Sequence, residues 1–145
     1  ADIIVKALEK ASITAASLHS GKTQAIREEA LQNFKGPNLR VLVATDVAAR
    51  GIDVNNITLI INYNLPEDPR NYIHRIGRTA RAGKSGVAIS FAVENDTRQL
   101  TNIENSIGQV IPIVTEQPFH KEFSKAPKQV KKKVKKTNRT RIKNK

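Results

Sequence analysis

Apolar positions along this chain follow two different periods, one typical of helices and one typical of strands. Three segments carry apolar residues at helical spacing: 3–11, 24–34 and 96–107. Gly108 directly follows the last of them and predicts its end, because glycine is the common residue just past a helix. The sequence therefore predicts three helices spread over most of the chain.

The remaining apolar residues gather in short runs that favour strands. Residues 13–18 predict a short strand, and 40–45, 58–63 and 86–93 are continuous β-favouring runs of the kind buried on both faces of a sheet. Strands that alternate with helices predict an α/β domain with a mostly parallel sheet and helices on both faces. Functional residues are then expected in the loops that follow the strands.

The net charge of +12 is concentrated at one end of the chain. Residues 121–145 hold twelve of the 25 Lys and Arg residues but one of the 13 Asp and Glu residues, which leaves 1–120 nearly neutral. From Pro118 onward apolar residues become rare and lysine dominates. We therefore expect a folded domain at 1–117 and a Lys-rich tail at 118–145 that is disordered in isolation.

Several classes of site and location are disfavoured by composition. The chain has no cysteine and three histidines, so neither a Cys-based zinc site nor a His-rich metal site is expected. No apolar run approaches the roughly 20 residues of a membrane span, and no secretory signal is found. We expect a cytoplasmic protein with no metal site of its own and no membrane contact.

Arginine is concentrated between His74 and Arg81, where Arg75, Arg78 and Arg81 are spaced three residues apart. If this segment is helical, the spacing places the three guanidinium groups on one helix face. Each guanidinium carries a permanent charge and a planar set of donors that suits phosphate oxygens. The pattern indicates a phosphate-binding role, and a solvated basic helix face is the alternative.

A second basic segment, residues 16–23, fits a relaxed version of the phosphate-binding loop of ATPases. The strict motif fails because alanine replaces its first glycine, and Leu18 and His19 add bulk where backbone amides must approach phosphates closely. An independent P-loop NTPase that uses Lys22 is therefore disfavoured. The remaining interpretation is contact between Gly21 or Lys22 and a phosphate of a polymer backbone.

Three segments together carry a family resemblance: QAIR at 24–27, ATDVAARGIDV at 44–54 and HRIGRTAR at 74–81. In this order and spacing they resemble the QxxR motif, motif V and motif VI of the second RecA-like domain of DEAD-box RNA helicases. The resemblance covers residues 1–114. The short domain and basic tail of this chain are similar to those of bacterial RhlE-type members of the family. Ala80 departs from the pattern, because glycine is common there.

The resemblance also implies parts that this chain does not contain. The strand and loop that precede residue 1 in the family (motif IV) are absent, so we expect domain 1–117 to lack its first strand. The first RecA-like domain, with its P-loop, DEAD box and adenine-reading glutamine, is absent as well. ATP with Mg²⁺ would be held mainly by that domain, and this chain alone is expected to have no ATPase activity.

The resemblance assigns nucleotide roles to residues of the last two motifs. Arg78 and Arg81 would be arginine fingers that stabilise charge on the transferring phosphoryl group. Asp53 would accept hydrogen bonds from the ribose, with a buried helix cap as the alternative, and Gly51 would allow close backbone approach or a turn. His74 would couple to the acidic motif of the first domain, or be satisfied locally.

Contacts with RNA are implied for Gly21, Gln24, Arg27 and Thr45. The start of the helix at 24–34 favours an anion there, and contacts of this kind hold the RNA backbone without reading its bases. RNA binding is therefore expected to be largely independent of sequence. For Arg27, a surface ion pair with Glu28 or Glu29 is the alternative.

Two further arginines are expected at the interface with the first RecA-like domain. Arg50 would face that interface. Arg75 would do the same, or form a structural ion pair with Asp46 or Asp53.

These expectations describe the C-terminal half of an ATP-dependent RNA helicase that clamps and unwinds short RNA duplexes when its two domains close on ATP. The expected partners are RNA, the first RecA-like domain of the same protein and, through the tail, ribosomal or ribonucleoprotein particles. The alternative is a stand-alone RNA-binding or chaperone module that acts through its basic tail. The tail lacks aromatic residues from Lys125 onward, so base stacking is not expected of it.

Overall fold

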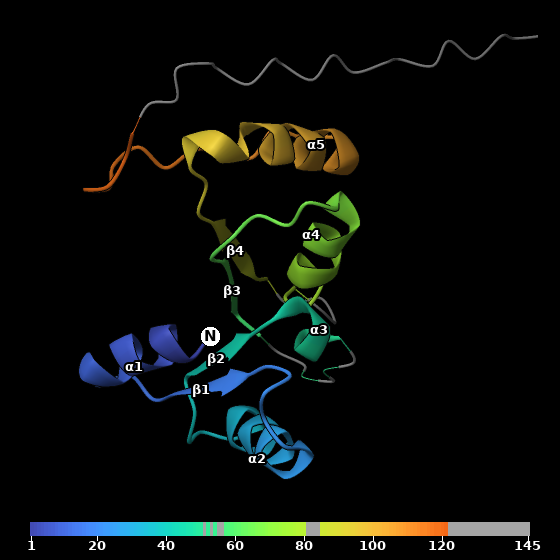
Figure 1. Cartoon of the computed structure of the whole chain (residues 1–145). Helices are drawn as coiled ribbons and strands as arrows, with labels where there is room; N and C mark the ends of the chain where they lie inside the picture. The colour runs from blue at the N-terminus through green and yellow to red at the C-terminus, as the bar shows by residue number, and fades with distance from the viewer. Residues whose placement is uncertain (51, 53, 55–56, 81–84, 122–145) are drawn as a thin grey trace, which may run out of the picture. The chain divides into compact units, whose positions relative to one another are not determined.

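Figure 1 shows a computed structural model of the 145-residue chain. It describes residues 1–50, 52, 54, 57–80 and 85–121. Their helices and strands follow one another as α1 (Asp2–Lys10), β1 (Ala15–Leu18), α2 (Gln24–Lys35), β2 (Val41–Ala44), α3 (Asp46–Ala49), β3 (Leu59–Asn62), α4 (Pro69–Ile76), β4 (Val87–Ser90), the 3₁₀ turn η1 (Glu94–Asp96) and α5 (Thr97–Ile107). The three helices and four strands predicted from the sequence are all present, and the strands are shorter than predicted at one or both ends.

Local chemistry explains where several helices begin and end. The hydroxyl of Thr23 accepts a hydrogen bond from the Ile26 amide at 3.4 Å, which caps the start of α2. Asp68 accepts from the Arg70 amide at 2.9 Å immediately before α4, and Pro69 occupies the first position of that helix. Gly108 ends α5 with φ of 72°, a left-handed conformation that glycine adopts at little cost.

The four strands are hydrogen-bonded as two pairs, β1 with β2 and β3 with β4. The first pair is parallel, with Ala15 opposite Val41 and Leu18 opposite Ala44. In the second pair the Val87 amide donates to the Thr58 carbonyl and the Phe91 amide to the Asn62 carbonyl. Both bonds join residues 29 positions apart, which is the signature of parallel strands. The prediction of a parallel α/β fold is confirmed.

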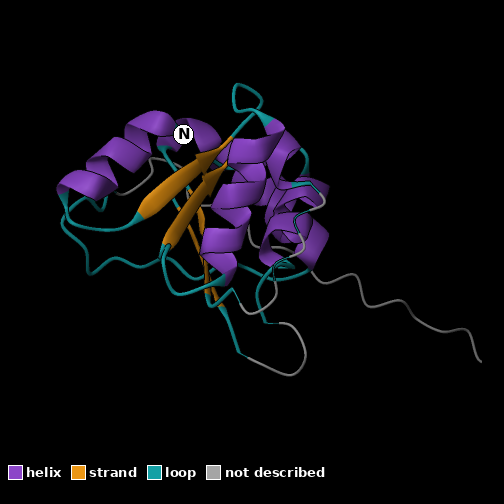
Figure 2. Ribbon diagram, turned by 90° about the horizontal axis from the view of Figure 1, so that it is seen from below, coloured by secondary structure: helices purple, strands orange, loops and turns teal. Residues whose placement is uncertain are grey.

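The chain divides into two compact units, residues 1–60 with 74–89, and residues 61–73 with the part that follows 89. In the first unit α1 and α2 pack against β1 and β2 from opposite sides (Figures 1 and 2). Leu18 is fully buried there, and removing a side chain of this size from water stabilises the fold by about 2 kcal/mol. This pair of strands thus has the predicted helices on both faces.

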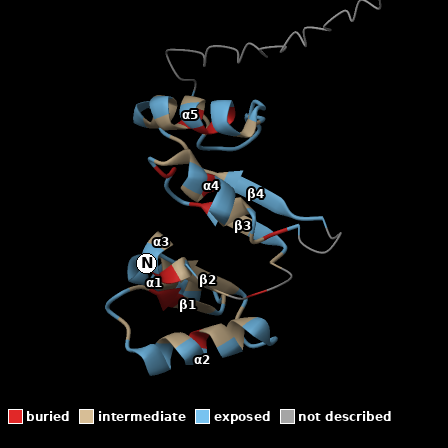
Figure 3. Ribbon diagram, turned by 90° about the vertical axis from the view of Figure 1, so that its right-hand side faces the viewer, coloured by how far each residue is buried: buried red, intermediate tan, exposed pale blue. Residues whose placement is uncertain are grey.

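The second unit has its own small core. Tyr72 of α4 is buried, as are Leu100 and Ile103 on one face of α5 (Figure 3). Two polar side chains are buried with them and are satisfied by hydrogen bonds. The Asn62 amide donates to the Ser90 hydroxyl at 3.1 Å, and a Glu104 carboxylate oxygen accepts from the Ile111 amide at 2.9 Å.

One prediction about the sheet is wrong: the runs at 58–63 and 86–93 are not buried on both faces. Side chains alternate along a strand, so Asn62 and Ser90 share one side while Ile61, Val87 and Ile89 lie on the other side and are exposed. The helices that pack closely on strands in the described part of the chain lie on β1 and β2.

Most of the predicted tail, from residue 122, lies outside the described residues. Within the described ranges, none of the helices has the length and apolar character needed to cross a bilayer.

Candidate functional site

The carboxyl ends of β1 and β2 meet at one edge of the first unit. The loop that follows β1, residues 19–23, is called here the β1–α2 loop. Thr45, which follows β2, donates its amide to the Leu18 carbonyl at 3.1 Å. The end of β2 therefore lies beside the start of this loop, and the fold brings together two of the segments predicted to contact RNA.

The β1–α2 loop is held by hydrogen bonds centred on Asp2 of α1. Ser17 donates its hydroxyl to Asp2 Oδ1 at 2.5 Å, His19 Nε2 lies 3.0 Å from Asp2 Oδ2, and Lys22 Nζ lies 3.4 Å from Asp2 Oδ1. The hydrogen bonds from Ser17, His19 and Lys22 hold the pKa of the Asp2 carboxyl well below its usual range. Asp2 is therefore ionised at neutral pH and anchors the loop to α1.

On the first turn of α2, the side chains of Gln24 and Arg27 form hydrogen bonds within the helix. Arg27 donates from Nη1 to Gln24 Oε1 at 3.4 Å, and Gln24 donates to Glu28 Oε1 at 2.7 Å. The Arg27 Nε atom is buried and has no hydrogen-bond partner among the described residues. The alternative ion pair of Arg27 with Glu28 or Glu29 is not found among those residues.

The contacts of the β1–α2 loop argue further against an ATP-binding P-loop. Such a loop offers free amides and a lysine to phosphates. Here the Gly21 amide donates to His19 Nδ1 at 3.2 Å and the Lys22 amide to the His19 carbonyl at 3.1 Å, while the Lys22 ammonium is paired with Asp2.

The arginine-rich segment that begins at His74 leaves α4 in a turn, residues 77–80, called here the arginine turn. The helix ends at Ile76, so the segment is not helical through Arg78, and the common face expected of a helical segment does not form between Arg75 and Arg78. The Arg78 and Thr79 amides donate three residues back, and Thr79 then forms a parallel β-bridge with Ile57. Pairing of Thr79 with Ile57 takes the place of continued helical hydrogen bonding.

Side chains of the arginine turn contact backbone carbonyls of the segment that follows α3. Arg78 donates from Nη1 to the Ile52 carbonyl at 3.0 Å, and the Thr79 hydroxyl donates to the Ile57 carbonyl. Arg78 is half-buried, and no ion pair between it and a carboxylate is found in the described part of the chain.

Arg75 forms a two-pronged ion pair with Asp46. Its Nε lies 2.6 Å from Asp46 Oδ1 and its Nη2 lies 2.7 Å from Oδ2. This hydrogen-bonded guanidinium holds the pKa of the Asp46 carboxyl below its usual value. The structural ion pair with Asp46, one alternative given for Arg75, is confirmed, and the interdomain role of Arg75 stays a prediction.

The remaining predicted residues are exposed or lie outside the described ranges. Thr45, Arg50 and His74 are exposed. Gly51, Asp53 and Arg81 lie outside the described residues. The roles predicted for these six residues stay predictions.

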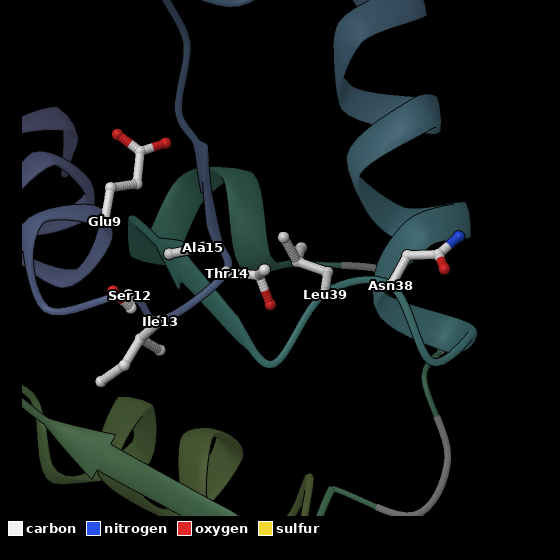
Figure 4. Close-up of a pocket in the computed structure, with 7 residues that line it drawn as sticks. All are labelled: Glu9, Ser12, Ile13, Thr14, Ala15, Asn38 and Leu39. Atoms are coloured by element: carbon white, nitrogen blue, oxygen red, sulfur yellow. The ribbon is translucent and has the colours of Figure 1, made fainter.

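A shallow hollow of about 420 Å³ lies at the opposite edge of β1 and β2 (Figure 4). It is lined by Glu9 near the end of α1, by residues 12–15 and by Asn38 and Leu39, which precede β2. In a parallel α/β sheet, ligands bind beyond the carboxyl ends of the strands, and this hollow faces the amino ends. We therefore place the candidate site in the β1–α2 loop, Thr45 and the arginine turn.

Sequence reasoning missed two features of this site. Asp2 had no motif around it, and its contacts join residues 15 and 17 positions apart. Ala80 adopts φ of 55°, in the left-handed region that favours glycine. The glycine common in the family at this position was the available signal.

Comparison with known proteins identifies the family. Residues 1–83 match the helicase conserved C-terminal domain. The chain is 45% identical over 116 residues to the ATP-dependent RNA helicase DBP8 of Meyerozyma guilliermondii, which covers 80% of this chain and 27% of that protein. It is 46% identical over 105 residues to the DEAD-box ATP-dependent RNA helicase CshA of Bacillus cereus, covering 72% of this chain and 20% of that protein.

Solved structures agree with these relatives. The E. coli DEAD-box protein SrmB, bound to regulator of ribonuclease activity A, matches with a TM-score of 0.77 and 35% identity over 86% of this chain and 75% of that chain. An S. cerevisiae Dbp5 variant bound to RNA and ADP BeF3 matches with a TM-score of 0.70 and 35% identity over 77% of this chain and 30% of that one. The chain therefore belongs to the helicase conserved C-terminal domain family, as the C-terminal RecA-like domain of a DEAD-box helicase. It spans about a quarter of the length of the DBP8 relative.

Proposed function

We propose that this chain is the C-terminal half of an ATP-dependent RNA helicase and that it grips the RNA backbone at the carboxyl edge of β1 and β2. In this proposal Thr45 and Arg27 bind neighbouring phosphates, with Gln24 and the Gly21 backbone beside them, and sequence is not read. The whole enzyme hydrolyses ATP and unwinds short duplexes by closing this domain on a first RecA-like domain.

The observation that carries the proposal is the hydrogen bond from the Thr45 amide to the Leu18 carbonyl at 3.1 Å. It joins the end of β2 to the start of the β1–α2 loop, at the edge where parallel α/β domains bind ligands. The buried Arg27 Nε, which has no hydrogen-bond partner among the described residues, supports an anionic ligand nearby. The Dbp5 structure with RNA supports the choice of polymer.

The nucleotide role of the arginine turn is also part of the proposal. ATP with Mg²⁺ supplies the phosphoryl group that is transferred to water, and the first RecA-like domain would hold it. Arg78 fits an anionic partner, because one of its five donors is used by the Ile52 carbonyl and no carboxylate neutralises it among the described residues. Arg78 and Arg81 would stabilise charge on the transferring group. The interdomain roles of Arg50, His74 and Arg75, and the tail's affinity for ribonucleoprotein particles, complete the proposal.

The RNA site is tested with one arginine from each edge of the same strand pair. Arg27→Ala removes a proposed phosphate contact, while Arg40→Ala removes the same charge from the exposed start of β2, at the opposite edge. A residue-resolved NMR titration of the 145-residue chain with a ten-nucleotide oligouridine separates binding at this site from binding by the tail. We expect Arg27→Ala to weaken binding at the Gly21 and Thr45 amides by about tenfold, since a charge-assisted contact is lost.

The control decides whether charge alone explains the loss. Arg40→Ala is expected to change binding at those amides by less than about twofold, because the screening length at physiological salt is only about 8 Å. Equal losses in the two variants, or binding that perturbs only residues after 120, would reject the site and favour a module that acts through its tail.

A further inference from the structure

The carboxylate of Asp2 connects α1 to the β1–α2 loop by a chain of two hydrogen bonds through one imidazole. His19 Nε2 lies 3.0 Å from Asp2 Oδ2, and the Gly21 amide lies 3.2 Å from His19 Nδ1. The His19 ring also packs against Gly21, where an added Cβ would lie 3.1 Å from two ring atoms. The ring therefore fixes the place of the Gly21 backbone.

The donors and acceptors of this chain have one consistent arrangement. A backbone amide can only donate, so His19 Nδ1 must accept the Gly21 hydrogen bond and carries no proton. The neutral ring then carries its proton on Nε2 and donates it to Asp2 Oδ2. Asp2 thus orients the ring, and the ring in turn orients the amide of Gly21.

We propose that Asp2 is a positioning residue for RNA binding, which acts through His19 to hold the β1–α2 loop in its phosphate-binding conformation. This inference rests on the proposed function of that loop. A loop that is already ordered loses less conformational entropy when it binds, so affinity is higher than for a mobile loop. The contacts of Asp2 with Ser17 and Lys22 fix the carboxylate itself.

Simple electrostatics predicts the opposite result, which makes the proposal testable. A negative charge beside a phosphate site repels RNA, and its removal should strengthen binding. If Asp2 positions the loop, its removal weakens binding instead. Glu9 provides the matched control, because it is an exposed carboxylate on the same helix and lines the hollow at the opposite edge.

The experiment compares Asp2→Ala, Glu9→Ala and His19→Ala in the 145-residue chain. Amide hydrogen exchange is measured without RNA, with Thr45 as the internal reference, because its amide is bonded to the Leu18 carbonyl and not to the imidazole. We expect Gly21 exchange to rise about tenfold in Asp2→Ala and in His19→Ala, and Thr45 exchange to stay unchanged, since one hydrogen bond is lost locally. Glu9→Ala should alter neither amide.

RNA affinity at the loop is then measured by the same oligouridine titration. Asp2→Ala is expected to bind about fivefold more weakly than Glu9→Ala, and the double variant Asp2→Ala/His19→Ala no more weakly than either single variant, because both changes break one chain of contacts. Affinity in Asp2→Ala equal to or above that of Glu9→Ala overturns the proposal, as does parallel acceleration of Gly21 and Thr45 exchange. If Arg27→Ala leaves binding intact, the RNA site itself is wrong, whereas the exchange result still tests the chain from Asp2 to Gly21.

Discussion

The β1–α2 loop with the first turn of α2, and the arginine turn with the end of α4, both present cationic side chains beside parallel strands, but the two regions use those side chains differently. In the first region, contacts between main chain and side chains fix the loop through Asp2 and His19, and Arg27 keeps a buried Nε with no partner among the described residues. In the second region the arginines themselves hold the structure, since Arg75 binds Asp46 and Arg78 binds the Ile52 carbonyl.

The two regions therefore show arginine in two settings, one with a carboxylate partner and one without such a partner among the described residues. A guanidinium that is matched by a carboxylate gains little from a further anion, because its charge is already compensated. Arg75 therefore has a structural contact, while Arg27 and Arg78 have no carboxylate partner in the described ranges, which is why the proposal assigns phosphate contacts to those two arginines.

The strongest test of the comparison is to disturb the arginine turn without touching the β1–α2 loop. Gly86 lies against this turn, and a Cβ added there would collide with the Thr79 hydroxyl and lie 2.7 Å from the Ala80 amide nitrogen. Gly86→Ala is therefore expected to lower the free energy of unfolding by about 3 kcal/mol, as overpacking of a fixed backbone does. Chemical denaturation measures the loss, and NMR should show shifts at Arg78 but not at Gly21.

Gly36→Ala is the matched control for that variant. The nearest atom to its added Cβ is a backbone oxygen at 3.7 Å, and its φ is −93°, so alanine fits without strain. We expect no loss of stability, because the change also reduces the entropy of the unfolded chain. Equal unfolding free energies for Gly86→Ala and Gly36→Ala would show that the arginine turn is not fixed by its packing.

The next test asks whether Arg75 is structural, by comparing it with a similar arginine. Arg75 and Arg70 each bind one aspartate through two nitrogens, but the Arg75 side chain is 24% exposed and that of Arg70 is 81% exposed. Arg75→Ala should lower the free energy of unfolding by about 1 kcal/mol, a value reduced by solvent because Asp46 is 38% exposed. Arg70→Ala should produce no measurable change.

The pH dependence of this loss has a definite sign. Arg75 lowers the pKa of Asp46 in the folded state, so the pair stabilises the fold above the usual carboxyl pKa of 3.8. The stabilisation is lost as the pH falls through the lowered folded-state pKa. The difference between wild type and Arg75→Ala, measured by urea unfolding, should be complete at pH 7 and shrink below about pH 4. A difference that stays constant down to pH 2 would rule out Asp46 as the partner.

The comparison also shows what the sequence could predict. Periodicity located α1, α2, α5 and the four strands, because apolar spacing reports which face of an element is buried, but it did not locate α3 and α4, which carry Asp46 and Arg75. Gly108 was correctly predicted to end α5, because glycine is favoured just past a helix. For Arg75 the sequence left three alternatives: an interdomain role, an ion pair with Asp46, or an ion pair with Asp53, since both carboxylates belong to the neighbouring motif.

Contacts between distant segments could not be predicted from local patterns. Asp2 meets His19 only because α1 packs against β1, and no spacing rule joins positions 17 residues apart. The end of α4 was missed for a similar reason, since the bridge between Thr79 and Ile57 competes with continuation of the helix. Exposure of β3 and β4 side chains depends likewise on what packs over them.

The smallest expected effect concerns the backbone of the arginine turn. Ala80 has φ of 55°, and a residue with a Cβ pays about 1 kcal/mol to occupy this region, while glycine does not. Ala80→Gly should raise the free energy of unfolding by about 0.5 kcal/mol, because relief of the strain exceeds the added entropy of the unfolded chain. Ala11→Gly is the control, since exposed Ala11 has φ of −89° and should lose stability instead.

This last variant also distinguishes strain from rigidity in the arginine turn. If the left-handed conformation is imposed by the bridge between Thr79 and Ile57, glycine relieves the strain and leaves the Arg78 hydrogen bond to the Ile52 carbonyl in place. The Arg78 side-chain NMR signals should then match those of wild type. If Ala80→Gly is instead less stable than wild type and its Arg78 signals are broadened, then alanine stabilises the fold by limiting the backbone conformations of the turn. The two regions would then differ less than the contacts of their arginines indicate, because both would depend on a backbone made rigid in advance.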